Sequence, residues 1–190
     1  NFNCPIILNE NLTKLIFGDN FNCPVVLNEN LKYLKLNHEF NQQVVLPELN
    51  HLILNCLDEN ILVNLMNNLP LSLIKLEIFD EFENIIPTDF SKFNFDNLPN
   101  NLEYLNIGIT RFKFELNNLP YGLIELDLTS SHYYSSKLDC LPNSLEILRL
   151  PFHYNEKISV LPTNIKYIYI NGKCEHIYDK KKNNPNIEIN

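Results

Sequence analysis

Residues 31–36 read Leu-Lys-Tyr-Leu-Lys-Leu, and the architecture of the chain follows from this short stretch. Leu34 and Leu36 share one face of an extended chain, while Tyr33 and Lys35 share the other, which is the two-residue period of a β-strand. The leucine that heads the stretch stands three residues before Leu34, where it closes the core at the turn into the strand. The stretch therefore predicts a short strand with one buried face and one open face.

The same pattern, apolar-x-x-apolar-x-apolar, occurs eight times in the 190 residues. The copies are Leu12-Leu15-Phe17, Leu31-Leu34-Leu36, Leu49-Leu52-Leu54, Leu73-Leu76-Ile78, Leu102-Leu105-Ile107, Leu123-Leu126-Leu128, Leu145-Leu148-Leu150 and Ile165-Ile168-Ile170. Repeats of this length are typical of solenoids, in which each turn buries its apolar face against its neighbours. We therefore predict a mainly β, leucine-rich-repeat-like solenoid over residues 1–170, with about eight repeats of 18–29 residues and a parallel sheet on one face.

Two further motifs describe the rest of each repeat. Leu-Pro precedes most of the predicted strands, at 46–47, 69–70, 98–99, 119–120, 141–142 and 161–162. Proline fixes φ and lacks an N–H donor, which suits a corner that enters a strand. Phe-Asn occurs at 2–3, 21–22 and 40–41, so that phenylalanine and asparagine each recur every 19 residues. We expect the aromatic rings to stack along an extended, irregular back and the asparagine side chains to bond the backbone of the next turn.

The combination of these motifs resembles the FNIP repeat family, a relative of leucine-rich repeats. The resemblance spans residues 2–170; the Leu-Pro half is well kept, whereas the Phe-Asn half is clear in three copies. Repeats of this family are similar to those of amoebae and of the giant viruses that infect them, where they often follow an N-terminal F-box. The resemblance implies the substrate-recognition part of an F-box ubiquitin-ligase adaptor, with the ligase core bound through an F-box that these residues do not contain. Since the chain starts at Asn1 in the middle of a repeat, we expect it to be part of a longer protein.

Three segments interrupt the repeats. Apolar residues at 61, 62, 65 and 66 have helical spacing and follow Asp58, a suitable N-cap, so we predict one short helix on the back. Residues 80–89 read as an acidic loop, which either contributes to binding or is a tolerated insertion. Residues 171–190 are expected to form a C-terminal cap or tail.

The strand alternation also predicts which side chains form the open side of the sheet. They stand at the third and fifth positions of each pattern, where Tyr and Arg are the residue types that dominate interface energetics. The residues that we expect to bind a protein partner are Tyr33, Lys35, His51, Ile53, Phe79, Tyr104, Tyr167 and Tyr169. The alternative is that large side chains stand there only because they favour strands.

The composition argues against several kinds of partner and against catalytic activity. A net charge of −8 and a pI of about 5.1 argue against nucleic acid and against an anionic membrane surface as partners. Four glycines leave no phosphate-binding loop, and no metal-binding pair has the required spacing around 174–176, so we expect no cofactor, no metal and no enzyme activity. Five cysteines cannot all pair internally, and at Cys4 and Cys23 we expect buried, reduced thiols, with a disulfide as the alternative.

The sequence therefore favours an intracellular, cytoplasmic protein-interaction module. The alternative is a structural repeat protein that self-associates or scaffolds a larger, for instance viral, assembly. The sequence does not identify the partner.

Overall fold

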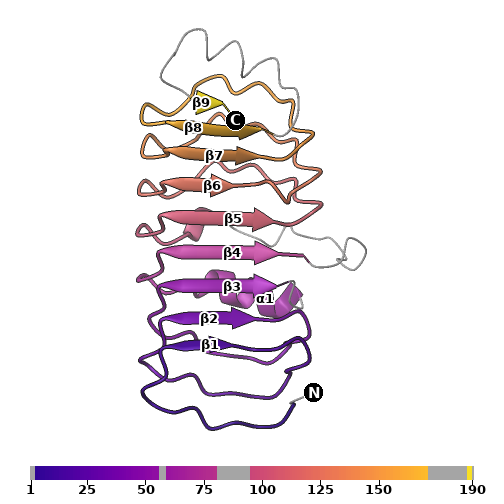
Figure 1. Cartoon of the computed structure of the whole chain (residues 1–190), viewed down its shortest axis with the longest axis vertical. Helices are drawn as coiled ribbons and strands as arrows, with labels where there is room; N and C mark the ends of the chain where they lie inside the picture. Colours follow the sequence, from indigo (N-terminus) through magenta and orange to yellow (C-terminus); the bar gives the residue numbers. More distant parts are fainter. Residues whose placement is uncertain (1–2, 56–58, 81–94, 171–187, 190) are drawn as a thin grey trace. The chain divides into compact units, whose positions relative to one another are not determined.

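A computed structural model describes residues 3–55, 59–80, 95–170 and 188–189 of the chain. The chain divides into two compact units, Asn1–Asn101 (unit 1) and Leu102–Asn190 (unit 2). Each unit is a series of solenoid turns that carry short parallel strands on one side (Figure 1). The predicted fold class, a mainly β solenoid of the leucine-rich-repeat type, is confirmed.

The strands coincide with the predicted patterns. Unit 1 contains β1 (Lys14–Ile16), β2 (Tyr33–Leu36), β3 (His51–Asn55) and β4 (Lys75–Phe79), paired in that order. Unit 2 contains β5 (Tyr104–Gly108), β6 (Glu125–Asp127), β7 (Ile147–Leu150), β8 (Tyr167–Ile170) and the short β9 (Glu188–Ile189), also paired in chain order. All of these pairings are parallel because every turn of the solenoid brings the chain back in the same direction.

The apolar positions of the pattern form the core of each unit. In β2, Leu34 and Leu36 are fully buried, and the register places Leu34 between Leu15 of β1 and Leu52 of β3. The head leucines, such as Leu31 and Leu145, are also fully buried. Burying a leucine contributes about 1.5–3 kcal/mol, so these columns of leucine stabilise the stacking of one turn on the next.

A tight turn precedes most strands and explains the Leu-Pro motif. The N–H of Leu145 donates to the carbonyl of Pro142 at 3.1 Å, and the same bond recurs at Pro70, Pro120 and Pro162. The first turns use asparagine instead, since the N–H of Leu31 donates to the carbonyl of Asn28 at 3.3 Å. This bond uses the carbonyl of proline and not an N–H, which proline lacks, and the fixed φ of proline favours the corner.

The back of unit 1 has the predicted aromatic stack and asparagine ladder. The rings of Phe21 and Phe40 are nearly parallel with centroids 6.4 Å apart, and Phe17 stacks on both. The Asn22 N–H donates to Asn3 Oδ1, and the Asn41 N–H donates to Asn22 Oδ1, both at 2.9 Å. Each asparagine therefore joins its own turn to the next one.

The aromatic position continues in unit 2, where asparagine follows Tyr154 but neither Phe112 nor Tyr134. Phe112, Tyr134 and Tyr154 are buried, with successive ring centroids 5.4 and 6.0 Å apart. Each of them is followed four residues later by a buried aliphatic residue. These residues are Leu116, Leu138 and Ile158.

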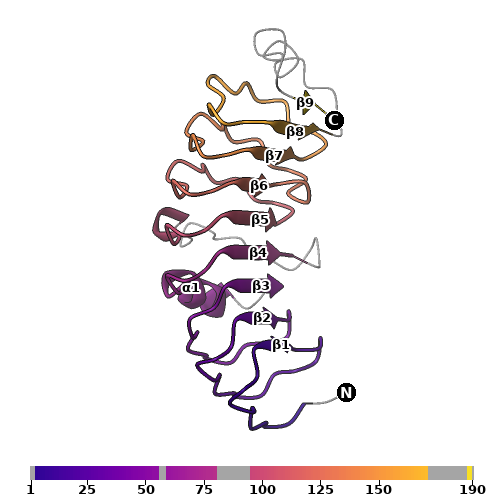
Figure 2. The same cartoon turned by 60° about the vertical axis from the view of Figure 1, so that its left-hand side comes forward.

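The predicted helix is present as α1 (Glu59–Asn67), and it lies away from the strands of unit 1 (Figure 2). Its residues Ile61, Leu62, Leu65 and Met66 are buried, as their spacing requires. A short 3₁₀ helix, η2 (Phe95–Asn97), contacts α1. The expected N-cap at Asp58, most of the acidic loop at 80–89 and the segment 171–187 lie outside the described residues.

The prediction of buried thiols is wrong. Cys4 is exposed and Cys23 is half-buried, and both are free. The Cys23 thiol donates to Asn3 Oδ1 at 3.2 Å, so it belongs to the polar ladder at the surface rather than to the apolar core.

Candidate protein-binding faces

The side chains at the third and fifth positions of the strands lie on one side of each sheet. All eight of the predicted binding residues are half-buried, and the residues that alternate with them in the strands are buried. Five of them belong to unit 1, namely Tyr33, Lys35, His51, Ile53 and Phe79, and three belong to unit 2, namely Tyr104, Tyr167 and Tyr169. We call these two surfaces the unit 1 strand face and the unit 2 strand face.

On the unit 1 strand face, one continuous series of contacts crosses four strands. Lys14 Nζ lies 4.4 Å from the centre of the Tyr33 ring, and the Tyr33 ring meets His51 edge to face at 4.7 Å. His51 Nε2 is 2.7 Å from Glu77 Oε1. The register aligns His51 with Lys75, so the His51–Glu77 bond runs diagonally to the next position of β4. These contacts fix the orientations of the four side chains in the unbound chain.

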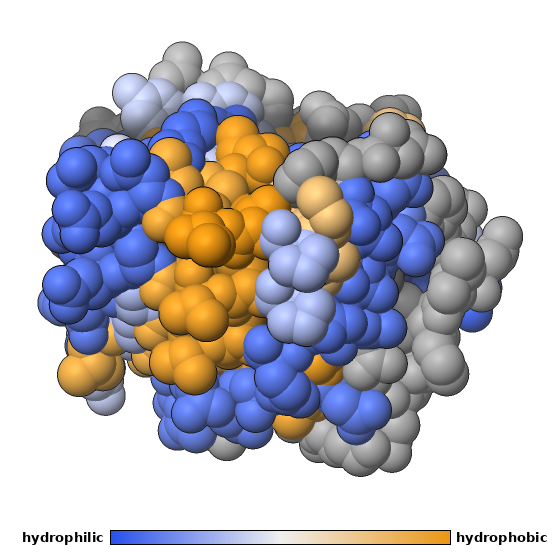
Figure 3. All heavy atoms as spheres, turned by 90° about the horizontal axis from the view of Figure 1, so that it is seen from below, coloured by the Kyte–Doolittle hydropathy of each residue, from blue (hydrophilic) through white to orange (hydrophobic). Residues whose placement is uncertain are grey.

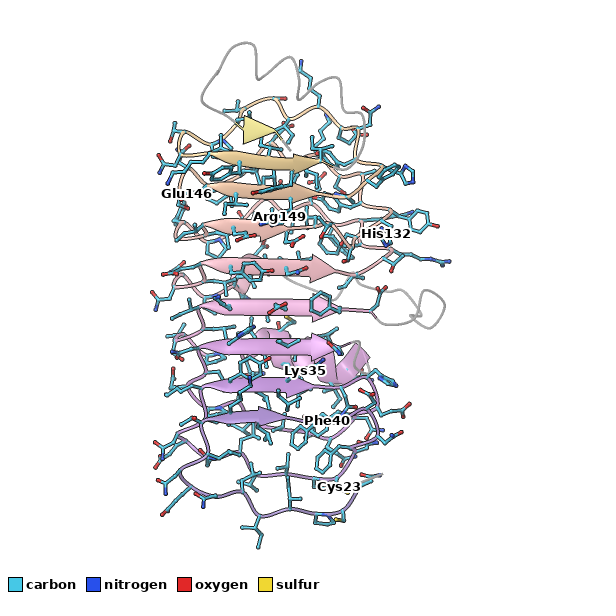
Figure 4. The ribbon with its side chains drawn as sticks, in the orientation of Figure 1. Cys23, Lys35, Phe40, His132, Glu146 and Arg149 are labelled. Carbon is cyan, nitrogen blue, oxygen red and sulfur yellow. The ribbon has the colours of Figure 1, made fainter. Side chains whose placement is uncertain are left out.

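The unit 2 strand face has a similar series centred on Arg149. Arg149 Nε donates to Glu125 Oε1 at 2.7 Å and lies 3.9 Å from Asp127 Oδ2. The guanidinium group stacks 4.1 Å from the centre of the Tyr169 ring, and Tyr169 stacks on Tyr167 at 6.3 Å. The hydrogen bond from Arg149 to Glu125 raises the pKa of the guanidinium group, which is protonated at neutral pH in any case. Figure 4 shows Arg149 on the strand side of unit 2.

The sign of the charge differs between the two strand faces. The unit 1 strand face carries Lys14, Lys35 and Lys75 against the single carboxylate of Glu77. Lys35, labelled in Figure 4, has no ion-pair partner within the described part of the chain. The unit 2 strand face carries two carboxylates and one guanidinium group, the three groups joined by the Arg149 contacts. A chain with net charge −8 thus presents an excess of positive charge on one strand face.

One expected face position is not on the surface. Asn106 occupies the fifth position of the fifth pattern, but only 8% of it is exposed. Its Nδ2 donates to the Tyr104 hydroxyl at 3.3 Å, and its Oδ1 has no partner among the described residues. The small side chain lies below Tyr104 and leaves the tyrosine as the accessible group of β5.

The end of unit 1 that carries β1 is a second apolar surface. Figure 3 views this end and shows apolar residues gathered at its centre with polar residues around them. Ile7 is fully exposed and Ile16 is 52% exposed. A hollow of about 370 Å³ lies between Ile6, Leu15 and Phe17. Among the described strands β1 pairs only with β2, so its outer edge has free backbone groups.

Sequence reasoning missed a groove on the back of unit 1. It has a volume of about 1040 Å³ and lies between residues 25–27, residues 43–47 and the side of α1 at Leu65. Val26 and Val45 on its wall are 87% and 88% exposed. The groove arises because α1 replaces the extended back segment of the preceding turns, which the irregular spacing at residues 55–73 signals.

The described residues contain no cluster of three His, Cys, Asp or Glu side chains that could hold a metal ion. In the same residues, no helix has the length and apolar character needed to cross a membrane.

Comparison with known proteins supports the fold. No protein-family model matches the chain, and no curated protein matches it. Among solved structures it is similar to CroV588, whose crystal structure is described as a novel circular LRR protein structure. The match has a TM-score of 0.61 and 30% sequence identity and covers 89% of this chain. The chain spans 26% of the length of CroV588. A leucine-rich-repeat-like solenoid is the fold of protein-interaction and structural repeat modules and is not typically that of an enzyme.

Proposed function

We propose that this chain is a protein-interaction module that binds a protein partner with its strand faces. The observation that supports the proposal is the series of linked Tyr, His and Arg side chains across β2–β4 and β6–β8. Tyr and Arg contribute most to binding energy at protein interfaces. The contacts among them reduce the side-chain entropy that binding would cost.

The partner of the unit 1 strand face is expected to be acidic at its point of contact. Lys35 has no carboxylate partner among the residues that the structure describes, while His51 is already bonded to Glu77. A carboxylate of the partner near Lys35 would therefore gain an ion pair without breaking one on this face. The exposed part of Ile53 and Phe79 would bury apolar side chains of the same partner.

We further propose that the partner is a substrate of a ubiquitin ligase and that the parent protein acts as an F-box adaptor in the cytoplasm. The support for this role is the FNIP-like repeat sequence. The free thiols of Cys4, Cys23 and Cys140 are consistent with a reducing compartment. The ligase core would be recruited by an F-box, and the strand faces would select the substrate.

Affinity purification of the full-length protein from its host cells tests the proposal. The unmodified protein is compared with a variant that combines Tyr33→Ala, Tyr104→Ala and Tyr167→Ala. A matched control combines Val26→Ser and Val45→Ser, because these residues are as apolar and even more exposed but lie on the back of unit 1.

We expect one group of proteins to be present with the unmodified protein and the control and absent with the tyrosine variant. Components of a ubiquitin-ligase core should remain with all three forms. Equal recovery of every protein by the tyrosine variant would contradict binding by the strand faces. Absence of ligase components from all samples would contradict the adaptor role and leave the binding proposal intact.

A second candidate function, self-association within a larger assembly, is favoured by the exposed end of unit 1. At this end Leu12 and Leu15 are only half-buried, whereas the equivalent Leu31 and Leu34 of the next turn are fully buried. The chain is similar to 26% of the length of CroV588, a protein that is described as a circular LRR structure. A second copy of the chain would therefore add its own edge strand to β1.

Sedimentation velocity over a range of concentrations tests self-association of the 190-residue chain. We expect a dimer that grows with concentration, and we expect Ile16→Lys to abolish it. Val26→Ser, which removes an exposed valine elsewhere on unit 1, should leave the dimer unchanged. A monomer at every concentration, or a dimer that Ile16→Lys does not affect, would rule out this edge.

A further inference from the structure

The loops that follow the strands of unit 2 carry a second polar-aromatic surface, apart from the strand faces. After β5, the Phe112 N–H donates to the carbonyl of Ile109 at 3.0 Å. After β6 and β7, the N–H groups of Tyr134 and Tyr154 make the equivalent bonds, at 2.9 and 3.0 Å. Each turn directs its aromatic residue into the buried stack. Both preceding residues are exposed in the turns after β6 and β7, whereas after β5 Arg111 is exposed and Thr110 is buried.

The exposed positions of these turns hold basic and aromatic residues. We call them the unit 2 rim: Arg111, His132, Tyr133, Phe152 and His153, all of which are exposed. The loops are adjacent in space, since the Tyr133 N–H donates to the carbonyl of Thr110 at 3.0 Å. Figure 4 shows His132 projecting beyond the ends of the strands.

The rim exposes two aromatic rings to water, which is unfavourable for apolar surface. Tyr133 is 61% exposed and Phe152 is 54% exposed. Phe152 and His153 meet edge to face at 4.8 Å, which fixes the orientation of both rings. Exposed apolar surface next to cationic groups is typical of a binding surface.

Acidic residues are absent from the parts of these loops that carry the rim, and Glu115, Asp139 and Glu156 follow those parts directly. Residues 104–114, 128–138 and 148–155 contain no Asp or Glu, although the chain has 23 acidic residues. The loop parts of the same segments contain Arg111, Lys113 and Lys137, while Arg149 lies in β7 and pairs with Glu125.

The equivalent turns of unit 1 show that the fold does not require this composition. The residues before Phe21 are Asp19 and Asn20, and the residues before Phe40 are His38 and Glu39. The backbone bond is the same, with Phe21 N–H donating to Gly18 at 3.0 Å. The exposed character of the rim is therefore not explained by folding.

We propose that the unit 2 rim binds an acidic segment of a partner protein, with carboxylates at Arg111 and the two histidines and an apolar side chain against Tyr133 and Phe152. This goes beyond the strand-face proposal, because it assigns a different surface and the chemistry of its ligand. A nucleic acid fits less well, since Arg111 is the one permanent cation of the rim, whereas a phosphate backbone is bound by several Lys and Arg side chains.

Selection from a random peptide display library tests the rim. The bait is the intact chain, and each selected peptide is synthesised with a fluorescent label for anisotropy. Binding is then compared for the intact chain, for a rim variant with Arg111→Glu and Phe152→Ser, and for Asp19→Asn as a control in the equivalent loop of unit 1. Circular dichroism confirms that all three are folded, which we expect because the substituted residues are exposed.

We expect the selected peptides to be rich in Asp and Glu, to lose at least tenfold in affinity when those residues become Asn and Gln, and to lose at least tenfold with the rim variant. Asp19→Asn should retain full affinity. The Tyr33, Tyr104 and Tyr167 variant should also retain it, so failure of the strand-face proposal would remain distinguishable. No enriched peptide, or peptides that bind the rim variant equally, would overturn the proposal. Single-stranded oligodeoxythymidine that binds through the rim while the acidic peptides do not would identify a nucleic-acid surface instead.

Discussion

At the scale of single residues, Tyr134 separates the contribution of a ring from that of a hydroxyl group. The ring stacks between Phe112 and Tyr154, but the hydroxyl oxygen is buried and has no hydrogen-bond partner among the described residues. Burial, with a smaller contribution from Glu115, raises the pKa of Tyr134 well above its ordinary value. The residue therefore stabilises unit 2 through its ring alone.

Tyr134→Phe should accordingly leave the free energy of unfolding unchanged or increase it by up to about 1 kcal/mol, because it removes an unsatisfied polar group. Tyr134→Ala should lower it by about 3–5 kcal/mol, since the whole ring is lost. Tyr154→Phe is the matched control, because the Tyr154 hydroxyl donates to the Ser136 carbonyl at 3.3 Å. Urea unfolding of the three variants measures the differences, and a larger loss for Tyr134→Phe than for Tyr154→Phe would contradict this assignment.

Asp139 is expected to make the stability of the chain depend on pH in the acidic range. Its carboxylate accepts the Ser159 N–H at 2.9 Å, and this bond is the main reason that its pKa is lowered; Lys137 and Lys157 contribute less. A lowered folded pKa adds stability above the unfolded pKa of about 3.9, and this stability is lost as the pH falls through the folded pKa. Asp139→Asn keeps an acceptor oxygen but does not titrate.

We therefore expect the stability of the unmodified chain to fall more steeply below about pH 4 than that of Asp139→Asn. Denaturant unfolding at a series of acidic pH values measures the slopes, and carbon NMR of the side-chain carboxyl group gives the pKa directly. Identical slopes, together with an unshifted titration, would show that the Ser159 bond does not favour the ionised carboxylate.

At the scale of the elements, side-chain amides join successive turns of the back by hydrogen bonds, as backbone groups join the strands of the sheet. Asn22 joins two turns, because its N–H donates to Asn3 and its Oδ1 accepts the Asn41 N–H. The buried Asn37 has a similar role, with Nδ2 donating to the carbonyl of Gly18 at 2.7 Å. The ladder explains why an asparagine-rich sequence suits a solenoid with an extended back.

Asn22→Ala should therefore lower the free energy of unfolding by about 0.5–1.5 kcal/mol, since the Asn41 N–H loses its acceptor. Asn41→Ala is a control on the same ladder, because among the described residues Asn41 Oδ1 accepts only from the neighbouring Gln42 side chain, at 2.6 Å. Asn41→Ala should lower the free energy of unfolding by less than Asn22→Ala does. Urea unfolding measures both, and an equal loss would mean that the asparagine ladder does not hold successive turns together.

At the scale of the whole molecule, the sequence predicted the architecture better than the surface chemistry. The strands were predictable because leucines such as Leu34 and Leu36 recur at one period in every turn. The aromatic stack of unit 2 was missed because the prediction relied on the asparagine after each phenylalanine. A different pattern does continue through unit 2, namely an aromatic residue followed four positions later by an aliphatic one, as in Tyr154 and Ile158. This pattern would have predicted the stack.

The contacts of the binding faces were not predictable for a different reason. Alternation identifies His51 and Arg149 as outward-facing, but it does not say which neighbour each will contact. Their bonds to Glu77 and Glu125 run diagonally between adjacent strands, so they depend on side-chain conformation as well as register. The outward direction of the rim residues similarly follows from the turn geometry after each strand, which the repeat pattern does not specify.

The division between core and surface applies to both units, so one set of variants tests it across the chain. Tyr33, Tyr104 and Tyr167 are half-buried, whereas Leu34 and Leu105, their immediate neighbours, are fully buried. Each Tyr→Ala change should lower the free energy of unfolding by about 1 kcal/mol, and the triple variant should stay folded. Leu34→Ala or Leu105→Ala alone should lower it by about 2–5 kcal/mol, because each leaves a cavity in the core.

Far-UV circular dichroism and urea unfolding of the two sets distinguish them. The result matters for function, because loss of partner binding by the tyrosine variant is informative only if the variant is folded. A strand shifted by one residue would exchange its two faces, and the leucine variants would then be the mild ones. That outcome would move the binding surface to other residues, whereas mild tyrosine variants and severe leucine variants leave the strand faces as the surface that a partner can reach.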